Sequence, residues 1–198
     1  MNTLKAEKRD MSIKAKKLRR EGFVTGNLFG RELEDSIPLK LDKAEVEKLL
    51  KVENKGGQVM LEVAGKTYDA LIKEVDYNPL KGYVDEIDFQ ALVSNEKVHS
   101  VAEIVLVNHD KLAAGVLQQH LEEISFRAFP SALVDKVMVD VGDMKVGDVI
   151  KVKDLAIAQD KDVDLKTDLE AAVVSVAAVH VDPALEAEEE AAAEEETK

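Results

Sequence analysis

The chain has 198 residues, of which 45% are hydrophobic, with no cysteine and a formal net charge of −13 at pH 7. This length and apolar content suffice for one or two domains with a buried core, and the lack of cysteine excludes disulfides and cysteine-based zinc sites, as is typical of the reducing cytosol. No apolar run is long enough to span a membrane, and the N-terminus lacks the apolar segment of a secretion signal, so we expect a cytoplasmic protein without a membrane partner.

Charge is segregated along the chain. Residues 1–31 contain nine Lys or Arg and three acids, a net +6, whereas residues 182–198 carry −7 and the 150 residues between them carry −12. A dense block of cations in an acidic protein is typical of a surface that binds phosphates. A solvated surface helix is the alternative, because charged runs are common on protein surfaces.

The first predicted elements are a short strand at residues 3–8 and a basic helix at residues 12–21. One narrow face of this helix would pack against a hydrophobic core. This face consists of Met11, Ala15, Leu18 and Gly22. Five cations occupy the rest of its circumference, namely Lys14, Lys16, Lys17, Arg19 and Arg20. Gly22 is well placed to end the helix.

The following segments alternate between apolar and polar residues, as half-buried strands do. Strands are expected at residues 23–30, 36–41, 58–63, 67–73 and 83–89. Asp42 begins a capping-box pattern, which predicts an amphipathic helix at residues 43–52. Gly65 can supply a positive φ in the hairpin loop, whereas residues 75–82 are interpreted as a turn-rich excursion.

The strand at residues 83–89 should present two different faces. One face would carry Tyr83, Ile87 and Phe89, and the other would carry Val84, Glu86, Asp88 and Gln90. Five or six short strands with one helix between them are typical of a small closed or half-closed β-barrel.

A domain boundary is expected where the alternation pauses, so that residues 1–93 form the barrel and residues 94–182 a second, β-rich domain. Strands are predicted there at residues 101–107, 124–129, 136–141, 149–152 and 171–179. Apolar spacing also predicts a helix at residues 116–124. Residues 183–198 are rich in Ala and Glu and should form a disordered or loosely helical acidic tail. The fold class is therefore mainly β with a few helices.

Catalysis has little support in the sequence. The four histidines lack metal-ligand spacing, and Gly65-Lys66-Thr67 lacks the earlier glycine of a phosphate-binding loop. No loop has the pattern of a calcium site. We therefore expect no catalytic residue, no metal and no cofactor.

Several motifs, in this order and spacing, resemble one known family. They are Lys-Ala-Lys-Lys-Leu-Arg-Arg-Glu-Gly at 14–22, Asn-Leu-Phe-Gly at 27–30, and further runs at 71–79, 87–89, 115–118, 124–130, 139–141, 147–148 and 154–155. Over residues 2–181 the chain resembles the long form of the bacterial large-subunit ribosomal protein that binds 5S ribosomal RNA, the general stress protein Ctc type.

The resemblance implies a ribosomal, non-enzymatic protein whose N-terminal barrel docks on 5S ribosomal RNA within the large subunit. It implies that the basic segment meets phosphates and that one barrel strand faces the RNA groove. The residues so implicated are Arg9, Lys14, Lys16, Lys17, Arg19, Arg20, Phe29, Lys73, Glu86 and Asp88. Off the ribosome we expect a monomer, and on it neighbouring ribosomal proteins are candidate contacts for the acidic half.

The chain departs from the family pattern in several places: the glycine-rich turn ahead of the basic helix is not visible at residues 10–13, the Pro-Ala of the next strand is replaced at Thr25-Gly26, and two candidate site residues differ. The family usually has His where Glu86 stands, and it often has Gln where Lys73 stands. Carboxylates that face a phosphate-lined groove would repel it, whereas Lys73 would attract it. The alternative hypothesis is therefore a stress-associated protein-interaction module that has lost RNA binding.

Overall fold

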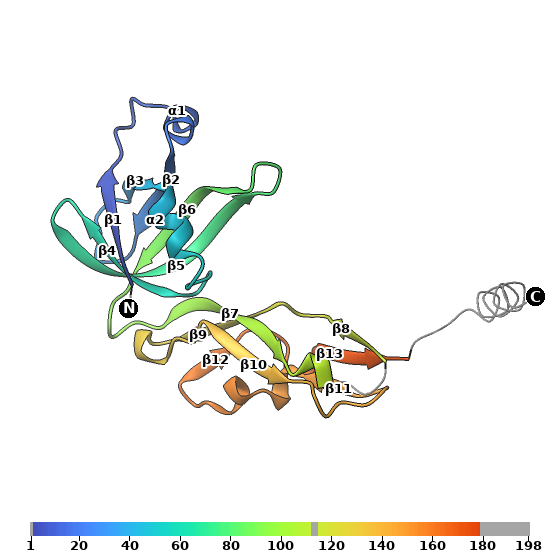
Figure 1. The fold of residues 1–198 in the computed structure, drawn as a ribbon. Coiled ribbons are helices and arrows are strands. Elements are labelled where there is room, and N and C mark those ends of the chain that lie inside the picture. Colours follow the sequence, from blue (N-terminus) through green and yellow to red (C-terminus); the bar gives the residue numbers. More distant parts are fainter. Residues whose placement is uncertain (1, 112–114, 179–198) are drawn as a thin grey trace, which may run out of the picture.

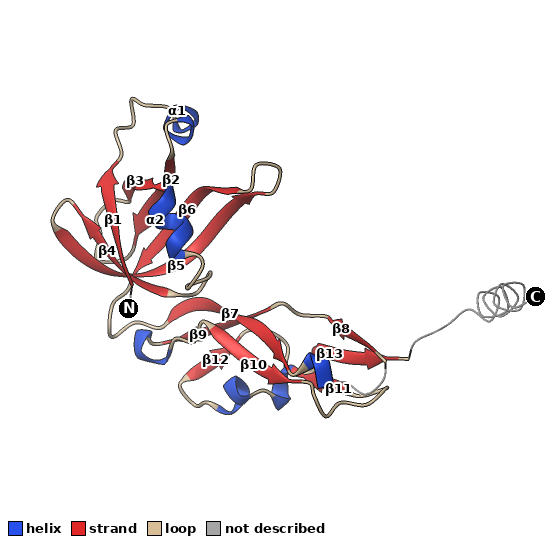
Figure 2. Ribbon diagram, in the orientation of Figure 1, coloured by secondary structure: helices blue, strands red, loops and turns tan. Residues whose placement is uncertain are grey.

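The computed structural model describes residues 2–111 and 115–178, which form two lobes made mainly of strands (Figure 1). The described residues contain thirteen strands and two α-helices, and these helices lie within the first lobe (Figure 2). The predicted fold class, mainly β with an N-terminal barrel and a β-rich second part, is confirmed.

The first lobe is a closed six-stranded barrel. Its strands are β1 (Asn2–Lys8), β2 (Phe23–Phe29), β3 (Ile37–Asp42), β4 (Gln58–Val63), β5 (Lys66–Asn78) and β6 (Tyr83–Ala91). They follow the order β1-β3-β2-β6-β5-β4, and parallel pairing of β1 with β4 closes the ring. Closure leaves no exposed edge strand, and the interior is filled by apolar side chains such as Leu28, Leu61 and Phe89.

One glycine permits the parallel contact between β2 and β6. Thr25 pairs with Glu86 and Leu28 pairs with Phe89, so Gly26 lies between the two pairs. A Cβ atom at Gly26 would stand 1.9 Å from the carbonyl oxygen of Ile87. The two strands can therefore approach this closely only if residue 26 has no side chain.

Both predicted helices of the barrel exist, but each is shorter than expected. In α2 (Lys43–Leu49) the Asp42 carboxylate accepts hydrogen bonds from the backbone N–H groups of Ala44 and Glu45, as the capping pattern predicted. The basic helix α1 spans only Ala15–Arg20 and has no side-chain cap.

Only part of the predicted apolar face of α1 is buried. Leu18 is 3% exposed and anchors the helix, and Gly22 follows its end with φ +90°, whereas Met11 is 68% exposed and lies outside the helix. The predicted face was too long because the backbone leaves the helical conformation before residue 15.

Two irregularities in the β5–β6 pair change the predicted faces. The register skips Lys73 on β5 and Asp85 on β6, as β-bulges do. Beyond the second bulge the alternation shifts, so Val84, predicted to share the face of Glu86 and Asp88, is 5% exposed and belongs to the core. Strand β5 also continues through Asn78, so the first half of the predicted turn-rich excursion is strand and the turn follows it.

The second lobe contains two sheets. Its strands are β7 (Val98–Val107), β8 (Val116–Gln119), β9 (Glu123–Ala128), β10 (Lys136–Asp140), β11 (Val149–Lys151), β12 (Val163–Leu165) and β13 (Ala172–Ala177). One sheet has the order β10-β7-β9-β12 and the other β11-β13-β8.

The helix predicted at residues 116–124 was wrong. Leu117 pairs with Val176 in the β8–β13 ladder, and Ile124 pairs with Ala102 in β9–β7. Apolar residues on two short strands happened to follow a helical spacing, and pairing with distant strands decided the structure.

Two predictions fall outside what the structure can describe or decide. The acidic tail at residues 183–198 lies outside the described residues, and the domain division after residue 93 stays a prediction. Within residues 2–111 and 115–178, no helix is both long and apolar enough to cross a membrane.

We predict that Gly26→Ala destabilises the barrel far more than Gly22→Ala. The first substitution drives a methyl group into the backbone of β6 and should lower the free energy of unfolding by about 3 kcal/mol or more. The second meets no atom within 4 Å but must keep φ +90°, which costs about 1–2 kcal/mol. Urea unfolding followed by circular dichroism measures both, and equal losses would contradict the close β2–β6 approach.

Candidate nucleic-acid interface

A row of polar and aromatic residues runs along the outside of the barrel where β2 and β6 meet. Thr25, Asn27 and Phe29 lie on β2, and their neighbours on β6 are Glu86, Asp88 and Gln90. Side chains of the intervening residues, such as Leu28 and Ile87, fill the core, so alternation directs these six away from it, although Thr25 is covered and only 1% exposed. We call these six residues the outer row.

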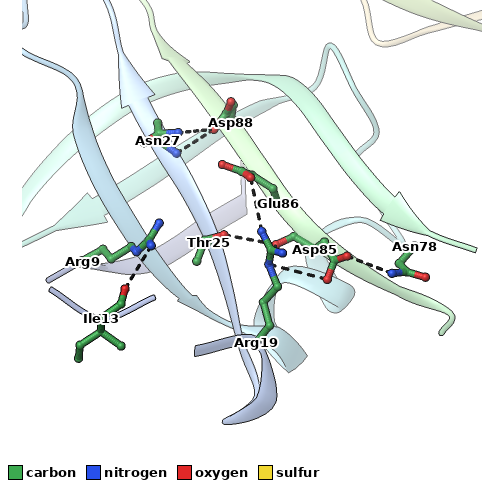
Figure 3. A network of polar contacts seen from close by, with 9 residues as sticks. All are labelled: Arg9, Ile13, Arg19, Thr25, Asn27, Asn78, Asp85, Glu86 and Asp88. Carbon is green, nitrogen blue, oxygen red and sulfur yellow. Dashed lines mark hydrogen bonds and ion pairs between the residues drawn. The ribbon is translucent and has the colours of Figure 1, made fainter. Parts of the chain in front are cut away.

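Asp88 holds Asn27 in place within the outer row. One carboxylate oxygen, Oδ1, accepts a hydrogen bond from the Asn27 backbone N–H at 2.9 Å and another from its side-chain amide at 3.1 Å (Figure 3). The Asn27 amide donates to Asp88, so its own Oδ1 is directed elsewhere as an acceptor. Asp88 thus organises a neighbouring polar group as well as contributing charge.

Arg19 reaches from α1 onto β6. Its Nε donates to the backbone oxygen of Asp85 at 3.1 Å and lies 3.8 Å from Asp85 Oδ1, while its Nη2 lies 3.7 Å from Glu86 Oε2 (Figure 3). The bulge explains the first contact, because Asp85 is skipped by the β5–β6 register and its carbonyl is accessible from the α1 side. We call these contacts the Arg19 bridge.

Four other cations of the basic segment are exposed. Lys14, Lys16, Lys17 and Arg20 all lie on or beside α1, which caps the end of the barrel away from the second lobe (Figure 1). Lys17 lies 3.9 Å from Glu21 in an exposed pair, which has little effect on its availability. Among the described residues, no ion pair involves Lys14, Lys16 or Arg20. We call these four residues the α1 cations.

Arg9 supports the loop that leads into α1. Its Nη2 donates to the backbone oxygen of Ile13 at 3.2 Å, and its backbone N–H donates to the Pro38 oxygen at 2.8 Å. Its Nε is buried without a hydrogen-bond partner in the structure. Arg9 therefore contributes positive charge at the edge of the outer row while one side of its guanidinium is held by the protein.

Carboxylates gather on the outside of β5 and β6. Glu74 pairs directly with Asp88, and Asp76 pairs with Glu86, which places like charges opposite each other. Burial raises the pKa of the Glu86 carboxyl, and the nearby Asp88 carboxylate raises it further, whereas Arg19 and Arg9 act in the opposite direction. We call Glu74, Asp76, Asp85, Glu86 and Asp88 the acidic face.

Lys73 does not share the environment of the other predicted site residues. It is the bulged residue of β5, and its Nζ donates to the backbone oxygen of His99 in the second lobe at 2.8 Å. Burial lowers the pKa of the Lys73 ammonium, with a further contribution from Lys55. The sequence predicted that Lys73 attracts RNA phosphates, and its position in the structure does not support that role.

The structure brings most of the predicted site residues to one end and one side of the barrel. Arg9, Arg19 and the α1 cations surround the α1 end, and Phe29, Glu86 and Asp88 lie in the outer row. Sequence reasoning missed the contributions of Asn27, Thr25 and Asp85. The sequence offered one indication of the role of Asn27, because an amide side chain stands inside a predicted strand. Nothing in the sequence indicated the bulge at Asp85.

Within the described part of the chain, no group of three or more His, Asp or Glu side chains is arranged to hold a metal ion. The site consists of exposed cations, a mixed polar row and carboxylates. Such a surface can bind a polyanion at the α1 end and accept hydrogen bonds along the outer row.

Comparison with known proteins decides the family. Residues 4–89 match the model of the Ribosomal L25p family, and residues 97–180 match that of the "Ribosomal protein TL5, C-terminal domain". A protein of Listeria monocytogenes serotype 4b, named large ribosomal subunit protein bL25, is 30% identical over 180 residues, which cover 89% of this chain and 86% of that protein. The chain belongs to the ribosomal L25p family.

Other members of the L25p family extend the similarity. Large ribosomal subunit protein bL25 of Caldanaerobacter subterraneus is 28% identical over 177 residues, 88% of each chain. The protein of that name from Geobacillus thermodenitrificans is 32% identical over 142 residues, 71% of this chain and 67% of its own. Because both family models match one after the other, the chain has the long form that the resemblance implied.

We predict that Asp88→Ala lowers the free energy of unfolding by about 2 kcal/mol, because the part-buried Asn27 N–H loses its acceptor. Asp88→Asn keeps an acceptor oxygen and should stay within about 1 kcal/mol of wild type. Urea denaturation of the two variants makes the comparison. If both variants are equally unstable, charge rather than hydrogen bonding is what Asp88 contributes.

Proposed function

We propose that this member of the L25p family is a structural protein of the large ribosomal subunit that binds 5S ribosomal RNA through its barrel. The α1 cations and Arg9 would hold phosphates, and the outer row would lie over the groove. The single observation that supports this most is the exposure of four cations on and beside a six-residue helix at the edge of the outer row.

The chemistry of RNA suits this arrangement. An A-form helix has a wide, shallow minor groove that displays 2′-hydroxyls and base edges, with phosphates at its borders. The α1 cations would fix the register on one border, and Phe29, Asn27 and Gln90 would meet the sugar edge. The Asn27 amide oxygen and the Asp88 carboxylate are acceptors for 2′-hydroxyl or base amino donors.

The partners and location follow from the same proposal. We expect the large ribosomal subunit in the cytoplasm to be the site of action, neighbouring ribosomal proteins to be contacts of the acidic half, and the free protein to be a monomer. Induction by stress stays a prediction of the sequence resemblance.

We predict that the double variant Lys16→Glu/Arg20→Glu weakens binding to 5S ribosomal RNA by about 100-fold or more, because two phosphate contacts become repulsive. In wild type, four or five cations should give a slope of log affinity against log salt on the order of −4, and the variant should have a shallower slope. Filter binding or fluorescence anisotropy at several salt concentrations measures both quantities.

The matched control is Lys48→Glu/Lys51→Glu, which reverses two exposed charges on and just after α2 and leaves α1 intact. Its affinity should change little at moderate salt. If both double variants weaken binding equally, the protein attracts RNA through net charge alone, and the assignment of phosphates to α1 is wrong.

We also propose that residues 1–93 form an independent RNA-binding domain and residues 94–182 a second domain. The barrel has its own closed sheet and its own core, which supports the first part. We predict that a fragment of residues 1–93 folds and binds 5S ribosomal RNA within about threefold of the full chain. A fragment that is folded but does not bind would show that the second lobe is needed for recognition.

The alternative is a stress-associated interaction module without RNA binding. The acidic face favours it, because five carboxylates on β5 and β6 oppose phosphates near the outer row. Measuring the affinity for 5S ribosomal RNA at several salt concentrations separates the two functions. An interaction module would not bind 5S ribosomal RNA even at low salt.

A further inference from the structure

Arg19 differs from the α1 cations because it is only partly exposed and lies close to two carboxylates of β6. Its guanidinium lies 3.8 Å from Asp85 and 3.7 Å from Glu86, and its side chain is 28% exposed. The Glu86 side chain is more open, at 38%, and lies in the outer row beside Asp88. An RNA phosphate that approached Arg19 would therefore meet the Glu86 carboxylate at the same guanidinium.

Charged groups from four neighbouring segments surround Glu86. Its own strand contributes Asp85 and Asp88, β5 contributes Asp76, α1 contributes Arg19, and the segment after β1 contributes Arg9, while β2 presents the uncharged Thr25. Burial and the Asp88 and Asp76 carboxylates raise the pKa of the Glu86 carboxyl, and the two guanidinium groups lower it, whereas Asp85 acts on Arg19. A phosphate bound next to these groups would favour the protonated form of the Glu86 carboxyl.

We propose that Glu86 determines the affinity of the RNA surface by competing with phosphate for Arg19. In the free protein the Arg19 bridge holds the guanidinium on β6, and in the complex a phosphate takes the place of Glu86. The proposal rests on the proposed function, because it assigns to Glu86 the control of that RNA site.

Competition of this kind makes binding depend on pH. Burial and Asp88 already place the pKa of Glu86 above its ordinary value, and a nearby phosphate would raise it further, so the complex takes up a proton. A group that binds its proton more tightly in the complex strengthens binding as pH falls. The effect is limited to about tenfold per pH unit for one proton.

The experiment measures the affinity for 5S ribosomal RNA between pH 5 and pH 8 at constant salt. We expect Glu86→Gln to bind about tenfold more tightly than wild type at pH 8 and to vary little with pH, and we expect wild type to approach it toward pH 5. Glu62→Gln, which removes the same charge from β4, should follow wild type. A Glu86→Gln variant with the affinity and pH profile of wild type overturns the proposal.

A double-mutant cycle with Arg19→Gln separates competition from simple repulsion. If Glu86 acts through Arg19, the gain from Glu86→Gln disappears in the Arg19→Gln background. If the gain persists there, Glu86 repels RNA directly and the competition for Arg19 is wrong.

A measurement without RNA distinguishes failure of this inference from failure of the proposed function. The ¹⁵N resonance of Arg19 Nε should move with pH in wild type and stay constant in Glu86→Gln. If the resonance moves but no form of the protein binds 5S ribosomal RNA, the proposed function fails and the role of Glu86 in affinity fails with it. If RNA binds while the resonance is the same in both proteins, the inference alone is overturned.

Discussion

The parallel pairing of β2 with β6 is the contact on which the barrel and its candidate RNA surface both depend. It joins two antiparallel groups, β1-β3-β2 and β6-β5-β4, and the β1–β4 pair then closes the ring. It also brings Asn27 beside Asp88, which are 61 residues apart in sequence. Gly26 permits the approach, since any side chain there would meet the Ile87 carbonyl. The outer row exists because one residue on β2 lacks a Cβ atom.

The same pairing positions the basic helix. Helix α1 has six residues and no side-chain cap, and an isolated helix of that length is unstable in water. It is held by Leu18 in the core and by Arg19 on β6, immediately before the chain enters β2. The orientation of the α1 cations is thus determined by tertiary contacts, so a weakened β2–β6 pair would disturb them as well.

Much of the barrel could be predicted from the sequence, because alternation, the Asp42 cap and the Gly65 turn are local signals. The cationic segment was also visible as a cluster. The bulges at Lys73 and Asp85 were not, because a skipped residue leaves an unremarkable sequence and yet changes every face beyond it. Lys73 therefore contacts His99, and Val84 enters the core. In the Arg19 bridge, Arg19 contacts Asp85 and Glu86, which follow it by 66 and 67 positions in the sequence. The periodicity of apolar residues carries no information over that separation.

The charge distribution explains how a neutral barrel in an acidic chain can favour one orientation on RNA. Residues 1–93 contain 17 Lys or Arg and 17 acids, so net charge gives the barrel no attraction for a polyanion. In the proposed function, attraction would come mainly from the α1 end, while Glu74 and Asp76 on β5 would make the far side of the outer row repulsive. Like charges opposite each other weaken the β5–β6 pair, and the side-chain hydrogen bonds and ion pairs of Asn27 and Arg19 in the described part of the chain go to β6 and not to the carboxylates of β5. An RNA held by α1 would therefore extend its sugar edge along β2 and β6 and keep its phosphates away from β5. In the proposed function, the acidic face would restrict the orientation of the RNA, while the α1 cations would supply affinity.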